Sequence, residues 1–562
     1  MDILSKLTRS LRLNVSAPNI LEPRSLFAGS KFHLPILIIL CAILFFWNIH
    51  VIPLTDGDSA FYAKIAKNIV ETGDWLTMHY GDASSIIDKP PLMMWLTAAS
   101  FKVFGVSDFA ASFWHSLCAL LIVIFTYQLA KELFDRRTAF LSSLVLISSA
   151  QFFYQARSPL QDIPLTLFTL LAVYAFILFE KTKKLGYFYL SPIFISLAVL
   201  TKGPVGLVLP AIILIAYVVI NRTKLPGIHH MFLASILFLA ITLPWFIFEY
   251  RLIGQKFFDV FISHNFGRYL KPVDTIGSEA TKYAPIKSQY DFYSYFLQMF
   301  LLAIPWSGFI YPAVYYNIKK KINLLPVILA LSVILFFSLS LNYKISRYIL
   351  PAFPGLALIT GKMLADLIEK EDPDAKRMAF ISAVLTLILV TLPLLTLAFV
   401  LFYVRFTDVS GYYAPTLVGF LLPMTFALIL GSVFIFIKKY RLSFLSLVIF
   451  ACLSYLFLIY NLAAYYPALN PASRFCAKIN GIAKPSDIVC QYRGTDAHFM
   501  IYYSKNNVTL IRNEGELKRL LLAKRKVFCV TESEGAFESL KASLKERIKV
   551  IDKSANFTLF TN

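Results

Sequence analysis

The chain has 562 residues, of which 58% are hydrophobic and only 15% are charged, and its mean hydropathy is +0.66. These values exclude an ordinary soluble globule and indicate a polytopic helical membrane protein. The net charge of +21 would also suit a nucleic-acid-binding protein, but the Lys and Arg residues stand in short clusters between apolar runs. Such clusters are typical of cytoplasmic loops, so we expect membrane lipids and no nucleic acid as partners.

Apolar runs long enough to cross a bilayer recur along most of the chain and predict about thirteen transmembrane helices. The first run follows a basic leader without a small-residue cleavage site, so we expect a retained span and not a cleaved signal peptide. The runs are 34–52, 109–130, 138–154, 163–180, 187–203, 206–220, 231–248, 292–316, 324–341, 348–367, 378–404, 416–437 and 443–462.

Basic clusters fall on alternate loops, which fixes the expected direction of the spans by the positive-inside rule. The basic N-terminus agrees with the loop clusters, which are Lys131/Arg136/Arg137, Lys181/Lys183/Lys184, Arg222/Lys224, Lys319–Lys321, Lys370/Lys376/Arg377 and Lys438/Lys439/Arg441. We therefore expect a multi-pass protein of the bacterial inner membrane, with the loops 53–108 and 249–291 and the C-terminal tail on the periplasmic side.

The first outer loop is a polar insert of about forty residues, too long for a simple connection between spans. A helix beginning near Asp58 presents one apolar stripe, made by Phe61, Ile65, Ile69 and Val70, and Gly73 can end it. A second helix can begin near Pro90-Pro91. The two predict amphipathic helices that lie on the membrane surface and form a platform for a polar substrate.

Asp56 and Asp58 flank a glycine where the chain leaves the first span. Helix capping and turn formation explain one of these carboxylates. Two carboxylates at a membrane exit favour a functional role, as a general base or a group that orients an acceptor.

The next pair, Asp88-Lys89, precedes the two prolines and allows two interpretations. Asp88 can cap the second helix while Lys89 is solvated, or Lys89 can contact a phosphate at headgroup depth. Local physics leaves both interpretations open.

Further outward turns carry charges of both signs. Asp162 can cap a helix or face a cavity shared with Asp58, and Lys202 breaks the positive-inside pattern, which favours a specific partner. His264 has no second histidine at the spacing of a zinc motif. Together these turns predict a site for an anionic, lipid-linked substrate. Their polar residues are Arg157, Asp162, Lys202, His264, Asn265, Arg268, Lys344, Arg347 and Tyr348.

We predict two domains, a transmembrane domain over 1–466 and a small soluble α/β domain over 467–562. Predicted strands are Ile488–Tyr492, Val508–Ile511, Lys526–Val530 and Ile548–Ile551, and predicted helices are Arg474–Ile479, Glu514–Ala523 and Ala536–Leu544. One disulfide among Cys476, Cys490 and Cys529 is possible outside the cytoplasm, while free buried thiols are the alternative. No catalytic motif stands in this tail.

Over residues 34–360 the order of these motifs resembles the GT-C glycosyltransferases, and among them the aminoarabinose–lipid A transferases and the related protein O-mannosyltransferase-like enzymes. The motifs that carry the resemblance are D-x-x-x-Y-A at Asp58–Ala63, G-D-W at Gly73–Trp75, D-K-P-P at Asp88–Pro91, Asp162, T-K-G at Thr201–Gly203, N-F-G-R-Y at Asn265–Tyr269, Pro305-Trp306 and K-x-S-R-Y-x-L-P at Lys344–Pro351.

The resemblance implies transfer of a sugar from a polyprenyl phosphate to a lipid or glycan acceptor such as lipid A, or to a protein, on the outer side of the membrane. It implies that Asp58 is the catalytic carboxylate and Asp162 a second acidic site residue. It assigns Lys89, Lys344, Tyr348 and Arg268 to the donor phosphate. The remaining expected site residues are Asp56, Tyr62, Asp88, Lys202, His264, Asn265 and Arg347.

The sequence departs from the family pattern at three positions. Phe61 stands where aminoarabinose members commonly have an arginine, and Asp88 stands where they have a glutamate. Asn265 takes the place of a histidine, with His264 one position earlier. Asp88 and His264 are thus the pair that could hold a divalent metal, and no cofactor is assigned.

Two other functions fit the same composition. A transporter or flippase of lipid-linked sugars would share the spans and a cationic pocket, but it predicts repeated, discontinuous spans and charged turns on both sides. A polymerase or ligase of surface polysaccharide would differ in its acceptor only.

Overall fold

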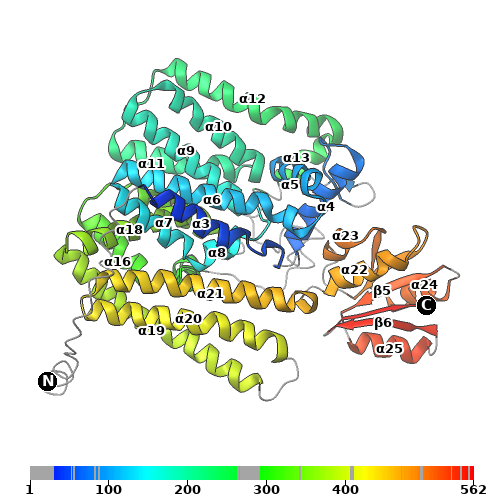
Figure 1. Ribbon diagram of the computed structural model, residues 1–562. Helices are drawn as coiled ribbons and strands as arrows, with labels where there is room; N and C mark the ends of the chain where they lie inside the picture. Colours follow the sequence, from blue (N-terminus) through cyan, green and yellow to red (C-terminus); the bar gives the residue numbers. More distant parts are fainter. Residues whose placement is uncertain are drawn as a thin grey trace.

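The computed structural model describes residues 31–51, 54, 57–80, 84–85, 89–262, 265, 291–340, 344–404, 410–469, 471–493, 498–523, 525–532, 534–544, 547–554 and 557–562. Long helices make up most of the described residues up to 469, and a small sheet with its own helices follows (Figure 1).

In each of the thirteen apolar runs most of the described residues are helical. The elements of this region are α3 (His33–Cys41) with the π-helical turn η1 (Ala42–Phe46) and η2 (Ile49–Val51), α6 (Asp108–Leu133), α7 (Arg136–Ile147), α8 (Ala150–Ala156), α9 (Asp162–Thr182), α10 (Leu185–Lys202), α11 (Val205–Asn221), α12 (Ile228–Ile253), α13 (Gln255–Ile262), α15 (Ser294–Leu302), α16 (Ser307–Lys319), α17 (Leu325–Ser338), η6 (Ser346–Ala352), α18 (Phe353–Glu369), α19 (Pro373–Val404), α20 (Ser410–Phe436) and α21 (Tyr440–Leu469).

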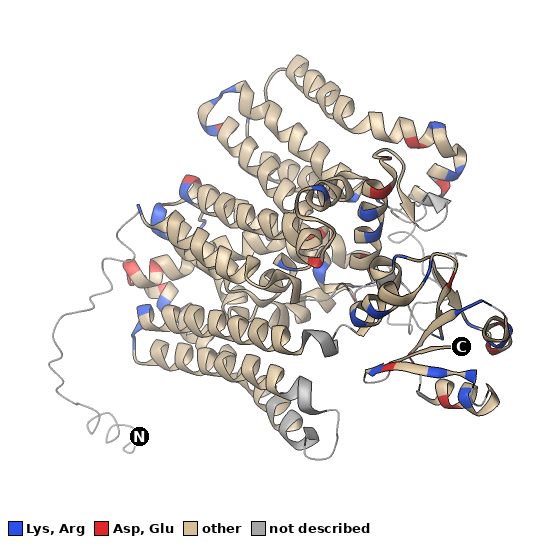
Figure 2. Cartoon of the chain, turned by 45° about the vertical axis from the view of Figure 1, so that its right-hand side comes forward, with Lys and Arg blue, Asp and Glu red and all other residues tan. Residues whose placement is uncertain are grey.

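Within the described ranges, nine helical segments are long and apolar enough to cross a membrane, or eleven when each of two bent pairs is one span. The bent pairs are α7 with α8, at 71°, and α15 with α16, at 119°. The other two predicted spans are α11 and α17, which are apolar but only 17 and 14 residues long. The expected count of about thirteen is reached when each bent pair and both of these short helices cross the bilayer. Figure 2 shows charged residues gathered at helix ends, with uncharged stretches between them.

The polar insert after the first span forms the two predicted helices, α4 (Gly57–Thr72) and α5 (Leu92–Phe104). Gly73 ends α4 with φ +75°, a left-handed conformation that glycine adopts without strain. The apolar stripe of α4 packs in a cluster with α5, because Ile65, Ile69 and Met94 are buried together. The short pair β1 (His79–Tyr80) and β2 (Ser84–Ser85), which the sequence did not predict, lies between the helices.

The tail forms an α/β unit around a five-stranded sheet of order β4-β3-β5-β7-β6. Its first three strands are parallel, and β5, β7 and β6 pair in antiparallel fashion. The strands are β3 (Ile488–Tyr492), β4 (Val508–Ile511), β5 (Val527–Thr531), β6 (Lys549–Ser554) and β7 (Phe557–Thr561), and the helices are α22 (Pro471–Ile482), α23 (His498–Tyr503), α24 (Glu514–Leu522) and α25 (Glu534–Leu544). Cys476, Cys490 and Cys529 are buried free thiols.

The tail contacts the outer helices through α23, which lies beside α4 (Figure 1). Lys67 of α4 donates hydrogen bonds to the carbonyl oxygens of Tyr502 and Ser504, at 3.0 and 3.2 Å. The ring of Tyr502 stacks on Phe101 of α5. These carbonyls end α23, where helix carbonyls lack partners within the helix, so the lysine satisfies them.

A buried arginine completes the end of the first span. Arg157 is fully buried, and its guanidinium donates to the carbonyl oxygens of Leu44, Trp47 and Asn48, at 2.8, 3.0 and 2.6 Å. Its guanidinium therefore lies inside the protein and not at the membrane surface. The arginine instead fixes the backbone that leads towards Asp58.

Candidate functional site

A pocket between α4, α9, α10 and η6 collects most of the expected site residues that the structure describes. It contains about 370 Å³ of space, part of it open to solvent. Its lining residues are Asp58, Tyr62, Lys89, Leu160, Gln161, Asp162, Lys202, Arg347 and Tyr348. We call this the charged pocket.

Arg347 connects the two expected carboxylates. Its guanidinium donates to Asp58 Oδ2 at 2.5 Å, and its Nε lies 3.6 Å from Asp162 Oδ2. The other oxygen of Asp162 pairs with Lys202 Nζ at 2.5 Å. Asp162 thus bridges two cations. Its side chain is only 3% exposed, whereas that of Asp58 is 49% exposed, so only Asp58 is open to an incoming group.

Local structure explains why these charges meet. Asp162 is the first residue of α9, where a carboxylate also interacts favourably with the helix dipole. Lys202 is the last residue of the antiparallel neighbour α10, and Gly203 follows it with φ +68°. The turn that glycine permits places the lysine opposite the start of α9.

Two further expected residues lie near the end of α10. The ring of Tyr348 lies 4.6 Å from Lys202 Nζ, within the range of a cation–π contact. Asn265 is buried beside Gly203, because a Cβ added to that glycine would lie 3.5 Å from Asn265 Oδ1 and 3.2 Å from the ring of Phe261. A side chain at position 203 would therefore crowd Phe261 and Asn265.

Lys344 has a different environment from the one expected. Its Nζ donates to the carbonyl oxygens of Phe337 and Ser338, at 3.1 and 2.7 Å, and to that of Ser340. An ammonium has three donors, so in this geometry none is left for a phosphate. Burial lowers the pKa of Lys344. The lysine holds the carbonyls at the end of α17 and does not line the charged pocket.

The remaining expected residues, Asp56, Asp88, His264 and Arg268, lie outside the described residues. The possible metal pair Asp88 and His264 is among them. Within the described ranges, no group of three or more His, Cys, Asp or Glu side chains could hold a metal ion.

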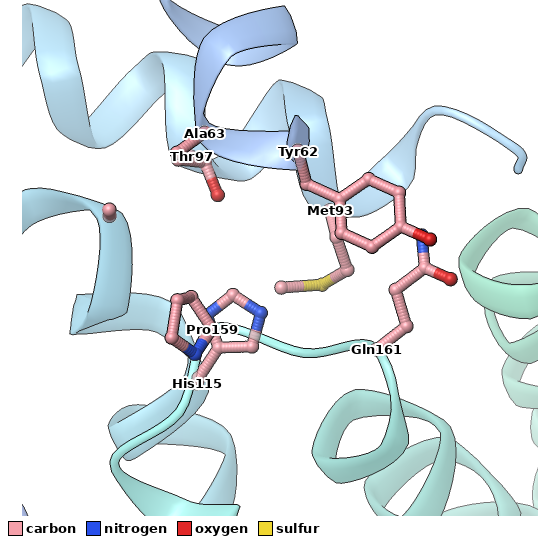
Figure 3. Close-up of a pocket in the computed structure, with 8 residues that line it drawn as sticks. Tyr62, Ala63, Met93, Thr97, His115, Pro159 and Gln161 are labelled. Carbon is pink, nitrogen blue, oxygen red and sulfur yellow. The ribbon is translucent and has the colours of Figure 1, made fainter. Parts of the chain in front are cut away.

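A second, smaller cavity adjoins the charged pocket and shares Tyr62 and Gln161 with it. Its other lining residues are Ala63, Met93, Thr97, Ala111, His115 and Pro159 (Figure 3). Gln161 and His115 were not among the expected site residues. Gln161 stands in the turn between two apolar runs and His115 within a run, and a single polar residue in either place gives no pattern that distinguishes a site from a helix contact.

Comparison with known proteins gives a consistent family signal. A family profile described as dolichyl-phosphate-mannose-protein mannosyltransferase matches residues 88–248. Two uncharacterised proteins of Aquifex aeolicus are similar: one is 28% identical over 90% of this chain and 95% of its own length. The other is 30% identical over 58% of this chain and 72% of its own length.

An undecaprenyl phosphate-α-4-amino-4-deoxy-L-arabinose arabinosyl transferase of Aeromonas hydrophila is 27% identical, and the match covers 57% of each chain. The similarity therefore spans little more than half of that relative. Among solved structures, ArnT from Cupriavidus metallidurans bound to undecaprenyl phosphate superposes with a TM-score of 0.74 at 19% identity, covering 95% of this chain and 98% of that one. At this identity the match concerns the fold.

Proposed function

The chain belongs to the GT-C superfamily of polyprenyl-phosphate-sugar glycosyltransferases, and we propose that it transfers a sugar from undecaprenyl phosphate to an envelope acceptor such as lipid A at the periplasmic face of the inner membrane. The observation that carries the proposal is the charged pocket, in which Arg347 connects a half-exposed carboxylate to a buried ion pair.

The balance of charge in this pocket suits the proposed donor. Its described lining holds three cations, Lys89, Lys202 and Arg347, and two carboxylates, Asp58 and Asp162. The excess of one positive charge matches a phosphodiester, which carries a single negative charge. When the bond from the phosphate oxygen to the sugar breaks, the phosphate gains a second negative charge. Cations already in position stabilise that developing charge without reorganisation.

Asp58 is the proposed general base. It stands in the first turn of α4, and its carboxylate is half exposed, so an acceptor hydroxyl can approach it. Asp58 takes the hydroxyl proton while the oxygen attacks the anomeric carbon. The bond to the phosphate oxygen breaks, and its electron pair remains on the phosphate. In-line attack inverts the anomeric centre. An acceptor phosphate would need only orientation.

Asp162 is proposed to act through its neighbours. Both of its oxygens face cations, and its side chain is almost fully enclosed. We therefore assign it the positioning of Lys202 and Arg347 rather than proton transfer. Removing it would leave two cations in the pocket without their common anion.

The decisive experiment measures sugar transfer in proteoliposomes that contain the purified protein, labelled undecaprenyl-phosphate sugars and an envelope lipid extract. Loss of a general base costs a factor of about 10² to 10⁴ in rate, so Asp58→Asn should show that loss while undecaprenyl phosphate still binds. Glu71→Gln is the matched control, because Glu71 is an exposed carboxylate near the other end of α4.

If Asp58→Asn transferred sugar at the wild-type rate, the proposed mechanism would be wrong. Transport of the intact lipid-linked sugar across the bilayer without its transfer would favour the flippase instead. Mass spectrometry of envelope lipids and proteins from a deletion strain would identify the acceptor. It separates lipid A from a protein acceptor, which the mannosyltransferase profile also allows.

A further inference from the structure

Gln161 is a buried amide without hydrogen-bond partners. The residue is 4% exposed, and neither Oε1 nor Nε2 has a partner among the described residues. Leaving buried amide atoms unsatisfied is unfavourable, so such groups are normally paired with protein, water or a ligand. The conclusion does not depend on which atom is oxygen and which nitrogen, because both lack partners.

The position of this amide relates it to the reaction. Gln161 immediately precedes Asp162 at the start of α9, and it lines both the charged pocket and the smaller cavity. Figure 3 shows its amide group on the same side of the cavity as the hydroxyl end of Tyr62. The side chain thus stands in the wall between the cations proposed for the phosphate and the smaller cavity, where His115 is also buried.

We infer that Gln161 recognises the sugar ring of the donor through a pair of hydrogen bonds, an inference that rests on the proposed function. An amide offers two N–H donors and one carbonyl acceptor, and neighbouring sugar hydroxyls or a hydroxyl and an amine each donate and accept. A polyprenyl chain has no such groups and would leave the amide unsatisfied. The phosphate offers acceptors only, and cations are already placed for it. The sugar is the part of the donor that satisfies both ends of Gln161.

This arrangement makes Gln161 a determinant of sugar specificity. A site whose buried polar group pairs with a substrate hydroxyl discriminates strongly against an analogue that lacks or inverts that hydroxyl, because the group is then left unpaired. Replacing the amide by an apolar side chain of similar length should remove that discrimination as well as part of the affinity.

The test compares Gln161→Met with Gln155→Met. Gln155 is a matched control, because it is an equally buried amide on α8, with its own unpartnered Oε1, and lies in neither pocket lining. Each protein is assayed with undecaprenyl phosphate linked to 4-amino-4-deoxyarabinose, to mannose and to glucose. Binding of undecaprenyl phosphate without a sugar is measured in parallel.

Gln161→Met should lower kcat/KM for the preferred donor by roughly 10- to 100-fold, flatten the preference among the three sugars and leave undecaprenyl phosphate binding unchanged. Gln155→Met should keep the wild-type preference. Gln161→Glu, which keeps the length and an acceptor but removes the amide donors, should also lose the preference, and it serves if the Met variant does not fold.

An active wild type with the same kcat/KM and the same sugar preference in the Gln161 variants would overturn the inference and leave the proposed function intact. An equal loss of sugar-free undecaprenyl phosphate binding would also overturn it, because the contact would then be to phosphate or lipid. A wild type that transfers none of the three sugars, nor any sugar present in the envelope of its host, would contradict the proposed function itself, and the inference would fall with it.

Discussion

The hydroxyl of Tyr503 donates a hydrogen bond to Asp108 Oδ2 at 2.8 Å, across 395 residues of sequence. Asp108 begins α6, and Tyr503 ends α23 in the tail. Together with Lys67, which holds the carbonyls of Tyr502 and Ser504, this bond fastens the tail to the outer helices. Because α4 also carries Asp58, the tail is mechanically connected to the helix of the proposed base.

Tyr503→Phe should destabilise the protein by about 1.5–3 kcal/mol, the range for a hydrogen bond to a charged group. Thermal unfolding in detergent measures this loss. Tyr460→Phe is the control, because Tyr460 is an exposed tyrosine on α21 and should be neutral. A double-mutant cycle with Asp108→Asn isolates the bond. The stability losses of the two single variants should add up to more than the stability loss of the double variant. Additive losses would show that the bond contributes nothing.

Lys89 and Lys344 should behave differently although the family resemblance gives both to the phosphate. Lys89 lines the charged pocket, so Lys89→Met should weaken undecaprenyl phosphate binding about tenfold or more with little change in unfolding temperature. Lys344→Met should lower the unfolding temperature and spare binding, because Lys344 bonds three carbonyls. Native mass spectrometry and thermal unfolding measure the two quantities. Weaker undecaprenyl phosphate binding with an unchanged unfolding temperature in Lys344→Met would instead indicate that Lys344 binds the phosphate.

The tail should lose stability in acid through Asp552. Burial raises the pKa of Asp552, but hydrogen bonds from Lys478 and Arg474 outweigh it and hold the pKa below its usual value of 3.8. A carboxyl whose pKa is lowered by folding stabilises the folded state above its unfolded pKa, and this contribution disappears as pH falls through the folded pKa.

Pepsin digestion of the full chain tests this, since pepsin works across the relevant acid range. At pH 4 the tail of Asp552→Asn should be cut faster than that of the wild type, and the ratio of the two rates should approach one as pH falls through the lowered pKa of Asp552. A ratio that stays constant over this range would assign no role to the ionisation of Asp552.

The tail and the cytoplasmic loops should label from opposite sides. All six cysteines are buried, so single new cysteines report topology with little background. In spheroplasts, a membrane-impermeant maleimide should react with Asn506→Cys in the tail and with Lys183→Cys only after lysis. Protection of the first or external labelling of the second would reverse the proposed orientation.

Local patterns predicted the local elements well. The strands Ile488–Tyr492 and Val508–Ile511 have the predicted bounds, and α4 ends at the predicted glycine. The helix α23, with sequence HFMIYY, and the strand β7 were missed. The helix α23 is only six residues long and is rich in residues that favour strands. Length does not explain the miss of β7, which has five residues, as many as the correctly predicted β3.

The sequence indicated which residues line the charged pocket better than it indicated which of them contact one another. Asp58, Asp162, Lys89, Lys202 and Tyr348 were expected near one site, and they line it. The pairing of Arg347 with Asp58 joins residues 289 positions apart, and no local pattern encodes such a contact. For Lys344 the motif was misleading in the other direction. Its position in the motif predicted a contact with phosphate, but its ammonium group donates to nearby backbone carbonyls, which the motif does not indicate.

The buried arginine at the end of the first span also orders events during synthesis. The carbonyl oxygens of Leu44 and Asn48 accept hydrogen bonds from the guanidinium of Arg157, which lies 113 and 109 residues further along the chain. When the ribosome has made only α3 and its π-helical turn, Arg157 has not yet been synthesised, so it cannot donate hydrogen bonds to these carbonyls. We expect the outer end of the first span to stay unfinished until α8 has been inserted, so that the approach to Asp58 is among the late parts of the molecule to become rigid. Arrested nascent chains that end before and after residue 157, probed by protease accessibility near residue 48, would show when that happens.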